Sequence, residues 1–138
     1  MHKSKQKLIV DAARSCIGAP FRLQGRDTKT GLDCIGLVLY AGRAAGFSST
    51  ADAHYCLTEK PDRLDGAIVA AQMLPLKFID IAAGDVLRFL TSGEPLHLGI
   101  ATGNGVIHAD IRFRRVVEHD LDKTWSMRLV KAYRFPIF

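Results

Sequence analysis

The first half of the chain carries apolar residues at the spacing of α-helices. From Lys5 to Cys16 the apolar side chains fall on one face and the charged ones elsewhere, which predicts an amphipathic helix that ends at Gly18-Ala-Pro20. A largely buried helix is expected from Cys34 to Ala45, followed by Gly46. A further amphipathic helix, from Lys60 to Leu74, carries a proline in its first turn.

The second half changes to short apolar runs that are typical of β-strands. The turn signal Gly103-Asn-Gly105 predicts a β-hairpin. The expected strands are Val86 to Leu90, Leu96 to Thr102, Val106 to Asp110, Arg115 to Glu118 and Met127 to Phe135. Helices followed by consecutive strands favour an α+β fold, with N-terminal helices packed on an antiparallel sheet, over alternating β-α-β winding. The intervening segments 21–30 and 47–58 are expected to be irregular.

Length, composition and charge exclude several classes of function. A chain of 138 residues with no repeat or linker predicts one domain, 1–138, and its apolar stretches are too short for a membrane span. The formal net charge is +5, but the basic residues are scattered without aromatic interleaving, which argues against nucleic-acid binding. The basic N-terminus lacks the apolar run of a secretory signal, so we expect no signal peptide.

Candidate chemistry begins at Cys34, which follows a turn and precedes the second helix. The start of a helix carries unpaired N–H groups and partial positive charge, and both favour the thiolate form of a cysteine. Asp33 is expected to cap this helix. Cys16 and Cys56 are interpreted as small buried residues, and the absence of C-x-x-C spacing argues against a metal site or a disulfide framework.

Histidines downstream complete the constellation of a cysteine hydrolase. His97 opens one strand of the expected hairpin, and His108 lies near the end of the other. Asn104 and Asp110 are alternative third residues, although Asn104 reads better as a turn former and Asp110 as a solvated strand end. The remaining histidines, His54, His119 and the terminal His2, are interpreted as surface residues or left without a role.

Five segments together carry a resemblance to a known family. They are Gly18 to Arg26, Gly31-Leu-Asp-Cys-Ile-Gly-Leu-Val38, Gly84-Asp-Val-Leu-Arg-Phe89, His97-Leu-Gly-Ile-Ala101 and Val106-Ile-His-Ala109. This pattern resembles the NlpC family of cell-wall cysteine peptidases over roughly residues 8–109. The resemblance implies a papain-like core, no cofactor, and hydrolysis of an amide bond in peptidoglycan stem peptides.

The resemblance also implies residue roles. Cys34 would be the nucleophile, His97 the general base and then acid, and His108 the residue that orients His97. The oxyanion hole would use the backbone N–H of Cys34 and one further donor.

Two positions depart from the family pattern. Ile35 stands where serine is common, and Phe21 stands where tyrosine is common. Phe21, Gln24 and Arg26 are the candidate substrate-binding residues, with Arg26 able to grip a carboxylate in a bidentate way or to remain a solvated loop residue.

The triplet Gln24-Gly-Arg26, together with the expected lack of a signal peptide, resembles the subgroup found in phage tails. A tail-associated lysin, with tail proteins as partners, is therefore the expected setting; before release it would lie in the particle or the cytoplasm. Two alternatives remain open. One is a non-catalytic module that binds cell wall or serves a structural role in a tail. The other is an amidase or acyltransferase that acts on another substrate, because fold analogy alone does not fix the reaction.

Overall fold

The computed structural model describes residues 4–48, 66, 68–69, 71–91 and 94–137. Cys56, His54, His2 and most of the expected helix Lys60–Leu74 lie outside these residues, as does most of the segment expected to be irregular after Phe47. The interpretations made for them therefore stay predictions.

The two helices expected near the N-terminus are confirmed. Helix α1 spans Lys5–Ser15, with the Ser4 hydroxyl accepting from the Lys7 N–H, and helix α2 spans Cys34–Arg43. Each ends within two residues of the predicted position. Helix α2 is largely buried, as expected, and its buried residues include Leu37, Val38 and Ala41.

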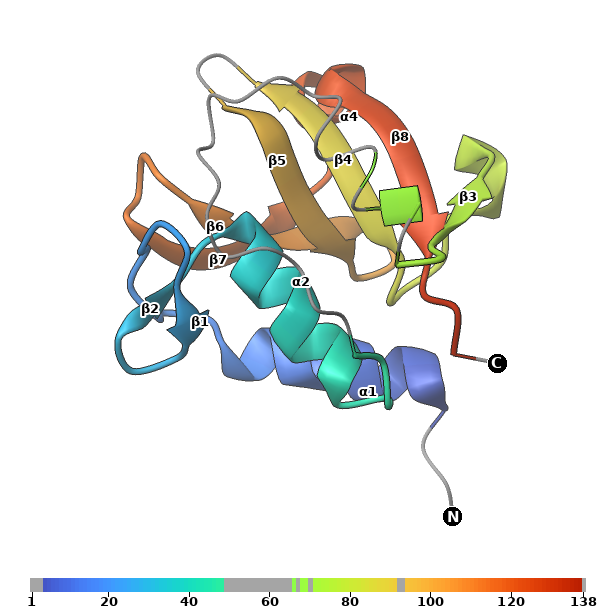
Figure 1. The fold of residues 1–138 in the computed structure, drawn as a ribbon. Helices are drawn as coiled ribbons and strands as arrows, with labels where there is room; N and C mark the ends of the chain where they lie inside the picture. Colours follow the sequence, from blue (N-terminus) through green and yellow to red (C-terminus); the bar gives the residue numbers. More distant parts are fainter. Residues whose placement is uncertain (1–3, 49–65, 67, 70, 92–93, 138) are drawn as a thin grey trace.

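The strands form a six-stranded sheet in the order β3-β8-β4-β5-β6-β7, in which all neighbours are antiparallel (Figure 1). Their bounds are β3 Leu74–Leu76, β4 Val86–Thr91, β5 Glu94–Ala101, β6 Gly105–Asp110, β7 Arg115–Asp120 and β8 Leu129–Arg134. A separate small hairpin, β1 (Arg26–Asp27) with β2 (Gly31–Leu32), precedes α2. Helices first and an antiparallel sheet second confirm the predicted α+β class.

Three local assignments differ from the sequence prediction, and the first is the segment 21–30, which was expected to be irregular but contains the short strand β1. Met127 was expected to begin the last strand, but it lies in a short helix, α4 (Lys123–Arg128), and β8 starts only at Leu129. The Asp122 carboxylate accepts from the Trp125 N–H and so caps α4. Leu74 was expected to end a helix, but it begins the edge strand β3, where Pro75 is tolerated. A single 3₁₀ turn, η1 (Phe78–Asp80), follows β3.

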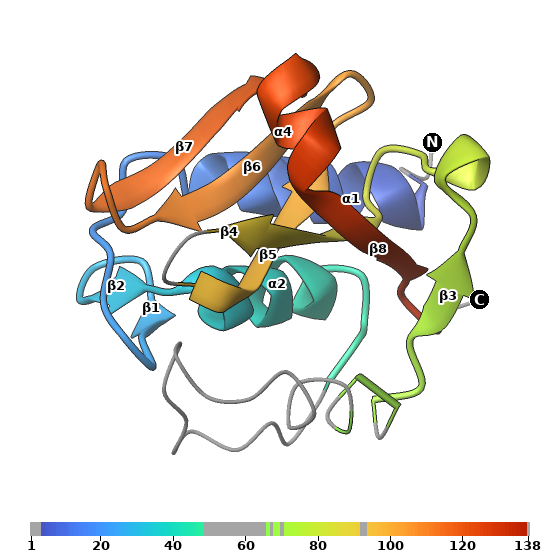
Figure 2. The same ribbon diagram turned by 90° about the horizontal axis from the view of Figure 1, so that it is seen from above.

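The two faces of the sheet bury different partners (Figure 2). One face packs on α1 and α2 through a core that includes Ile9, Leu37 and Ile100. The other face, which includes Phe89, packs against Trp125 of α4. Residues alternate between the two faces along each strand, so odd-numbered positions of β5 face α4 and even-numbered positions face the helices.

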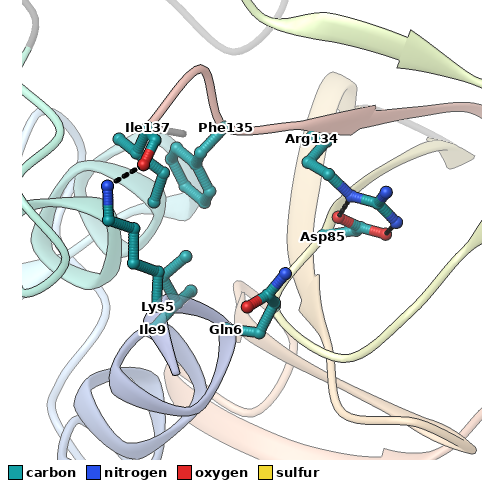
Figure 3. Close-up of a pocket in the computed structure, with 8 residues that line it drawn as sticks. Lys5, Gln6, Ile9, Asp85, Arg134, Phe135 and Ile137 are labelled. Carbon is teal, nitrogen blue, oxygen red and sulfur yellow. Dashed lines mark hydrogen bonds and ion pairs between the residues drawn. The ribbon is translucent and has the colours of Figure 1, made fainter. Parts of the chain in front are cut away.

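The N-terminal end of α1 contacts the segment that follows β8 (Figure 3). Lys5 Nζ donates to the carbonyl oxygen of Ile137, and nearby the guanidinium of Arg134 holds both carboxylate oxygens of Asp85 at 2.9 Å. The hollow between them, about 10 Å³, is about the size of one water molecule. This contact closes the end of the core that lies away from Cys34.

Candidate active site

Cys34 is the first residue of α2, as predicted, and is only 1 % exposed. The Asp33 carboxylate accepts from the Gly36 N–H at 2.8 Å, which confirms the predicted cap. The first-turn N–H groups of a helix that carry no intrahelical bond point towards its start, where the Cys34 thiol lies. The local field at this position favours negative charge on sulfur.

Asp33 also fixes the loop that precedes the helix. Its second oxygen accepts from the backbone N–H of Gln24 at 2.8 Å, and Arg26 Nη1 lies 3.3 Å from its first oxygen. Asp33 is fully buried, and the Arg26 side chain is partly exposed. The cap, the loop backbone and the guanidinium therefore form one bonded unit directly before Cys34.

Two glycines allow that loop to lie flat on α2. A Cβ at Gly36 would overlap the carbonyl oxygen of Gly25, and a Cβ at Gly25 would overlap that of Gly31. Gln24 adopts a left-handed backbone with φ of 61°, which turns the chain into this contact. Only glycine fits at positions 25 and 36 without moving the backbone.

Three histidines form a hydrogen-bonded row across β5, β6 and β7. His97 Nε2 lies 2.8 Å from His108 Nδ1, and His108 Nε2 lies 2.7 Å from His119 Nε2. His119 Nδ1 lies 2.9 Å from the carbonyl oxygen of Asp120. Successive histidines are eleven positions apart, and each lies on a neighbouring strand and on the face that packs against α4. The row runs from a buried ring at His97 to a half-buried one at His119.

Trp125 covers this row. Its ring centroid lies 5.9 Å from that of His97, 4.7 Å from that of His108 and 5.0 Å from that of His119. Phe89 packs edge-on against Trp125, and the guanidinium of Arg128 lies 5.0 Å from the centroid on its ring. The His97–His108 hydrogen bond is buried, and the His108–His119 bond is partly buried.

Close approach of the strands brings His97 and His108 together. A Cβ at Gly99 would come within 2.6 Å of Val106 Cγ2 and 3.3 Å of His108 Cβ. The ladder between β5 and β6 pairs only Ile100 with Ile107 and Ala101 with Val106. The predicted hairpin is thus confirmed, and the bond between the two rings spans the part of the hairpin beyond the ladder.

Cys34 and His97 lie at the same end of the sheet. The chain around Pro20 bridges to Arg115 at the start of β7, and Phe21 pairs with Leu32 two positions before Cys34. Because β6 runs antiparallel to both neighbours, its last residue, the start of β7 and the first half of β5 share that end. Phe21 is half-buried against the core there.

Burial changes the acid–base properties of two groups. It lowers the pKa of His108 to about 3, with further lowering from His97 and His119, so the ring is neutral at physiological pH. Burial raises the pKa of the Cys16 thiol to about 11, and its exposure of 1 % confirms the prediction of a small buried residue.

The interpretations of His119 and Asp110 as surface residues were wrong. His119 is half-buried beneath Trp125 and bonded to His108, and Asp110 is only 3 % exposed. Asp110 accepts from the Arg112 N–H at 2.7 Å and lines, with His97 and Arg128, a pocket of about 110 Å³. Asn104 lies in the turn at the other end of the hairpin, as expected for a turn former, and so away from His97.

The geometry suits proton transfer rather than metal binding. The nitrogens of the three rings point at one another in series and do not converge on one point. Within the described part of the chain, no group of three or more histidine, cysteine or acidic side chains could hold a metal ion. None of the described helices has both the length and the apolar character needed to cross a bilayer.

Comparison with known proteins identifies relatives along most of the chain. The model of the NlpC/P60 family matches residues 18–134. A probable endopeptidase from Corynebacterium glutamicum is 34% identical over 122 residues, which cover 86% of this chain and 50% of the relative. The murein DD-endopeptidase MepH from Escherichia coli is 29% identical over 113 residues, which cover 75% of this chain and 37% of that protein. The chain thus spans about half or less of the length of these curated relatives.

Solved structures share the fold at low sequence identity. The NlpC/p60 domain of the peptidoglycan hydrolase SagA superposes with a TM-score of 0.67 at 22% identity, covering 93% of this chain and 97% of that domain. RipD from Mycobacterium tuberculosis gives a TM-score of 0.67 at 16% identity, with coverage of 96% and 98%. RipD is described as a non-catalytic NlpC/p60 domain protein adapted to peptidoglycan binding. These likenesses confirm the predicted papain-like α+β fold.

Proposed function

The chain belongs to the NlpC/P60 family, and on that premise we propose that it is a cysteine peptidase that hydrolyses an amide bond in peptidoglycan stem peptides. The observation that carries the proposal is the pairing of a cysteine at a capped helix start with a buried His97–His108 hydrogen bond at the same end of the sheet. The curated relatives named as endopeptidases support the same class of reaction.

The proposed mechanism gives each of these groups one role. His97 takes the proton of Cys34, and the thiolate attacks the scissile carbonyl to form a tetrahedral intermediate. The first-turn N–H groups of α2, with that of Cys34 foremost, stabilise the oxyanion. His97 then gives the proton to the leaving amine, which leaves the acyl group on Cys34. Water, deprotonated by His97, attacks this thioester, and the Cys34 thiolate leaves and regains its proton from His97. His108 is neutral and fully buried, and it holds the His97 ring in place throughout.

The decisive experiment is mass spectrometry of purified muropeptides incubated with the wild type and variants. Cys34→Ala and His97→Ala are expected to abolish turnover, because each removes a participant in bond cleavage. Cys16→Ala is the matched control, since it removes a buried thiol from the same core without touching the reaction. Undiminished cleavage by Cys34→Ala, or a wild type that cleaves no muropeptide, would contradict the proposal.

Substrate contacts form the second part of the proposal. Phe21, Gln24 and Arg26 lie on the segment that packs against α2 and β7 next to Cys34. A stem-peptide carboxylate is the ligand proposed for Arg26, because a guanidinium binds a carboxylate in a bidentate way. An increase in KM with unchanged kcat in Arg26→Lys would support substrate binding, whereas unchanged KM would remove Arg26 from it.

The tail-associated setting is also proposed, and it rests on the resemblance of Gln24-Gly-Arg26 to the tail subgroup. Immunoblots of purified phage particles are expected to detect the protein. Recovery only as free cytoplasmic protein that acts on a soluble amide would contradict this setting and favour the amidase alternative.

A second candidate function is binding of peptidoglycan without catalysis, because RipD shares the fold and is described in those terms. Cys34, His97 and His108 are all present here, which favours catalysis. Brief alkylation with iodoacetamide at pH 6 separates the two, since a nucleophilic Cys34 should react under these conditions and an inert one should not.

A further inference from the structure

The hydrogen bonds of the histidine row determine where each proton lies. A carbonyl oxygen only accepts, so the 2.9 Å contact with Asp120 requires the proton of neutral His119 on Nδ1 and leaves Nε2 as an acceptor. The proton between His119 and His108 therefore belongs to His108 Nε2. In neutral His108, Nδ1 is then an acceptor, and the bond between the first two rings requires a proton on His97 Nε2.

The result is that one backbone carbonyl fixes three tautomers in sequence. His97 is left with its basic lone pair on Nδ1, the nitrogen that does not bond to His108. Burial supports the premise that His108 is neutral, because it lowers the pKa of that ring to about 3. Trp125 supports the geometry, because its ring packs against both buried imidazoles and so restricts their orientation.

We propose that His119 is a positioning residue of the active site, which acts through His108 to hold His97 in the tautomer with basic Nδ1. The chemical part of the inference rests on the proposed cysteine peptidase function; the tautomer assignment does not. In the alternative tautomer the proton would lie on His97 Nδ1, and the ring could not accept the Cys34 proton at that atom.

The substitutions follow from what position 119 must provide, which is an acceptor for the His108 Nε2 proton. His119→Phe keeps a ring beneath Trp125 but removes the acceptor. His119→Gln places an amide oxygen close to where the imidazole Nε2 lies, so it keeps the acceptor without the ring. Glu118→Gln, on the same strand, is the control for disturbance of β7, because Glu118 contacts Arg14 and not the histidine row.

Kinetics on the cleaved muropeptide give the first readout. His119→Phe is expected to lower kcat by about 10- to 100-fold with KM unchanged, the size of effect typical when a supporting hydrogen bond behind a functional histidine is lost. His119→Gln should recover most of this loss, and Glu118→Gln should match the wild type. A purely packing role predicts the opposite order, with Phe tolerated better than Gln, and that outcome would overturn the inference.

Imidazole ¹⁵N–¹H correlation spectra at neutral pH give a readout that needs no turnover. In Cys34→Ala, His97 is expected as the tautomer protonated on Nε2; adding His119→Phe should populate the form protonated on Nδ1, and adding His119→Gln should not. Two results would overturn the inference. One is a His97 protonated on Nδ1 in Cys34→Ala, and the other is a His97 tautomer that stays the same when His119→Phe is added. If the wild type cuts no muropeptide, the proposed function fails, and these spectra still decide the role of His119.

Discussion

At the scale of single residues, the two cysteines in the described part of the chain occupy contrasting sites. Cys34 lies at a helix start, whereas burial raises the pKa of Cys16 to about 11. Brief treatment with iodoacetamide at pH 6 is therefore expected to label Cys34 and leave Cys16 unmodified. Peptide mapping by mass spectrometry measures this directly. Labelling of Cys16 ahead of Cys34 would contradict the assignment of the nucleophile.

His108 gives a prediction about stability and pH. Its pKa in the folded protein, about 3, is below the ordinary value of 6.5, so between these values the unfolded chain binds a proton that the folded protein does not. The effect of His108 on the free energy of unfolding should be small above pH 6.5. Below that value the free energy of unfolding should fall as the pH falls towards 3.

From pH 7.5 to pH 5 this one group should cost about 2 kcal/mol of unfolding free energy. Urea unfolding at the two pH values measures the loss, and His108→Gln, which cannot titrate, should lose correspondingly less over the same interval. Equal losses in the two proteins would mean that the buried ring titrates as it does in the unfolded chain.

At the scale of elements, the first turn of α2 depends on Asp33 for more than a cap. Asp33→Ala removes acceptors from Gly36, Gln24 and Arg26 at once, so it should destabilise the protein by more than the ~0.5–2 kcal/mol of an ordinary N-cap. It should also slow alkylation of Cys34, because the helix start is no longer held in place.

Ser4→Ala provides the matched control for this variant, since it removes the cap of α1 and nothing else. It should cost only the ordinary amount and leave the alkylation rate unchanged. Thermal unfolding and alkylation time courses test both variants. Equal changes in unfolding temperature and alkylation rate in the two variants would show that Asp33 acts only as an N-cap.

Elements with local sequence signals were the ones that could be predicted. The helix that starts at Cys34 was predictable because its cap, its apolar period and its terminal glycine are all local signals. The His97–His108 pair was predictable from the hairpin turn and from the family resemblance.

The role of His119 was not predictable in this way. Its neighbours Glu118 and Asp120 suggest a surface strand, and its burial comes from Trp125. Trp125 lies on α4, a helix that was not predicted and whose Met127 was expected to begin a strand. Recognising Asp122 as a cap for α4 would have removed the second error but not the first, because contact between strand and helix is set by tertiary packing. The error on α4 is therefore one of local sequence signals, whereas the error on His119 comes from tertiary packing.

At the scale of the whole molecule, the formal charge of +5 should favour capture by anionic cell wall. Binding of inactive Cys34→Ala protein to purified sacculi is expected to weaken as salt rises, because the Debye length is only about 8–10 Å at physiological ionic strength. A sedimentation assay over a salt series measures this. Binding that is independent of salt would show that attraction by net charge is not what holds the protein to the wall.

The close contact of Gly25 with Gly36 bears on how domains of this family could be recombined. The loop that carries Gln24 and Arg26 and the helix that carries Cys34 touch backbone to backbone, and Asp33 bonds to both. A chimera that takes only the loop from a relative would place that loop against a helix whose backbone it does not fit. Crossovers placed before residue 18 and after residue 43 should move loop and helix as a single cassette, and such exchanges are expected to fold where shorter ones do not.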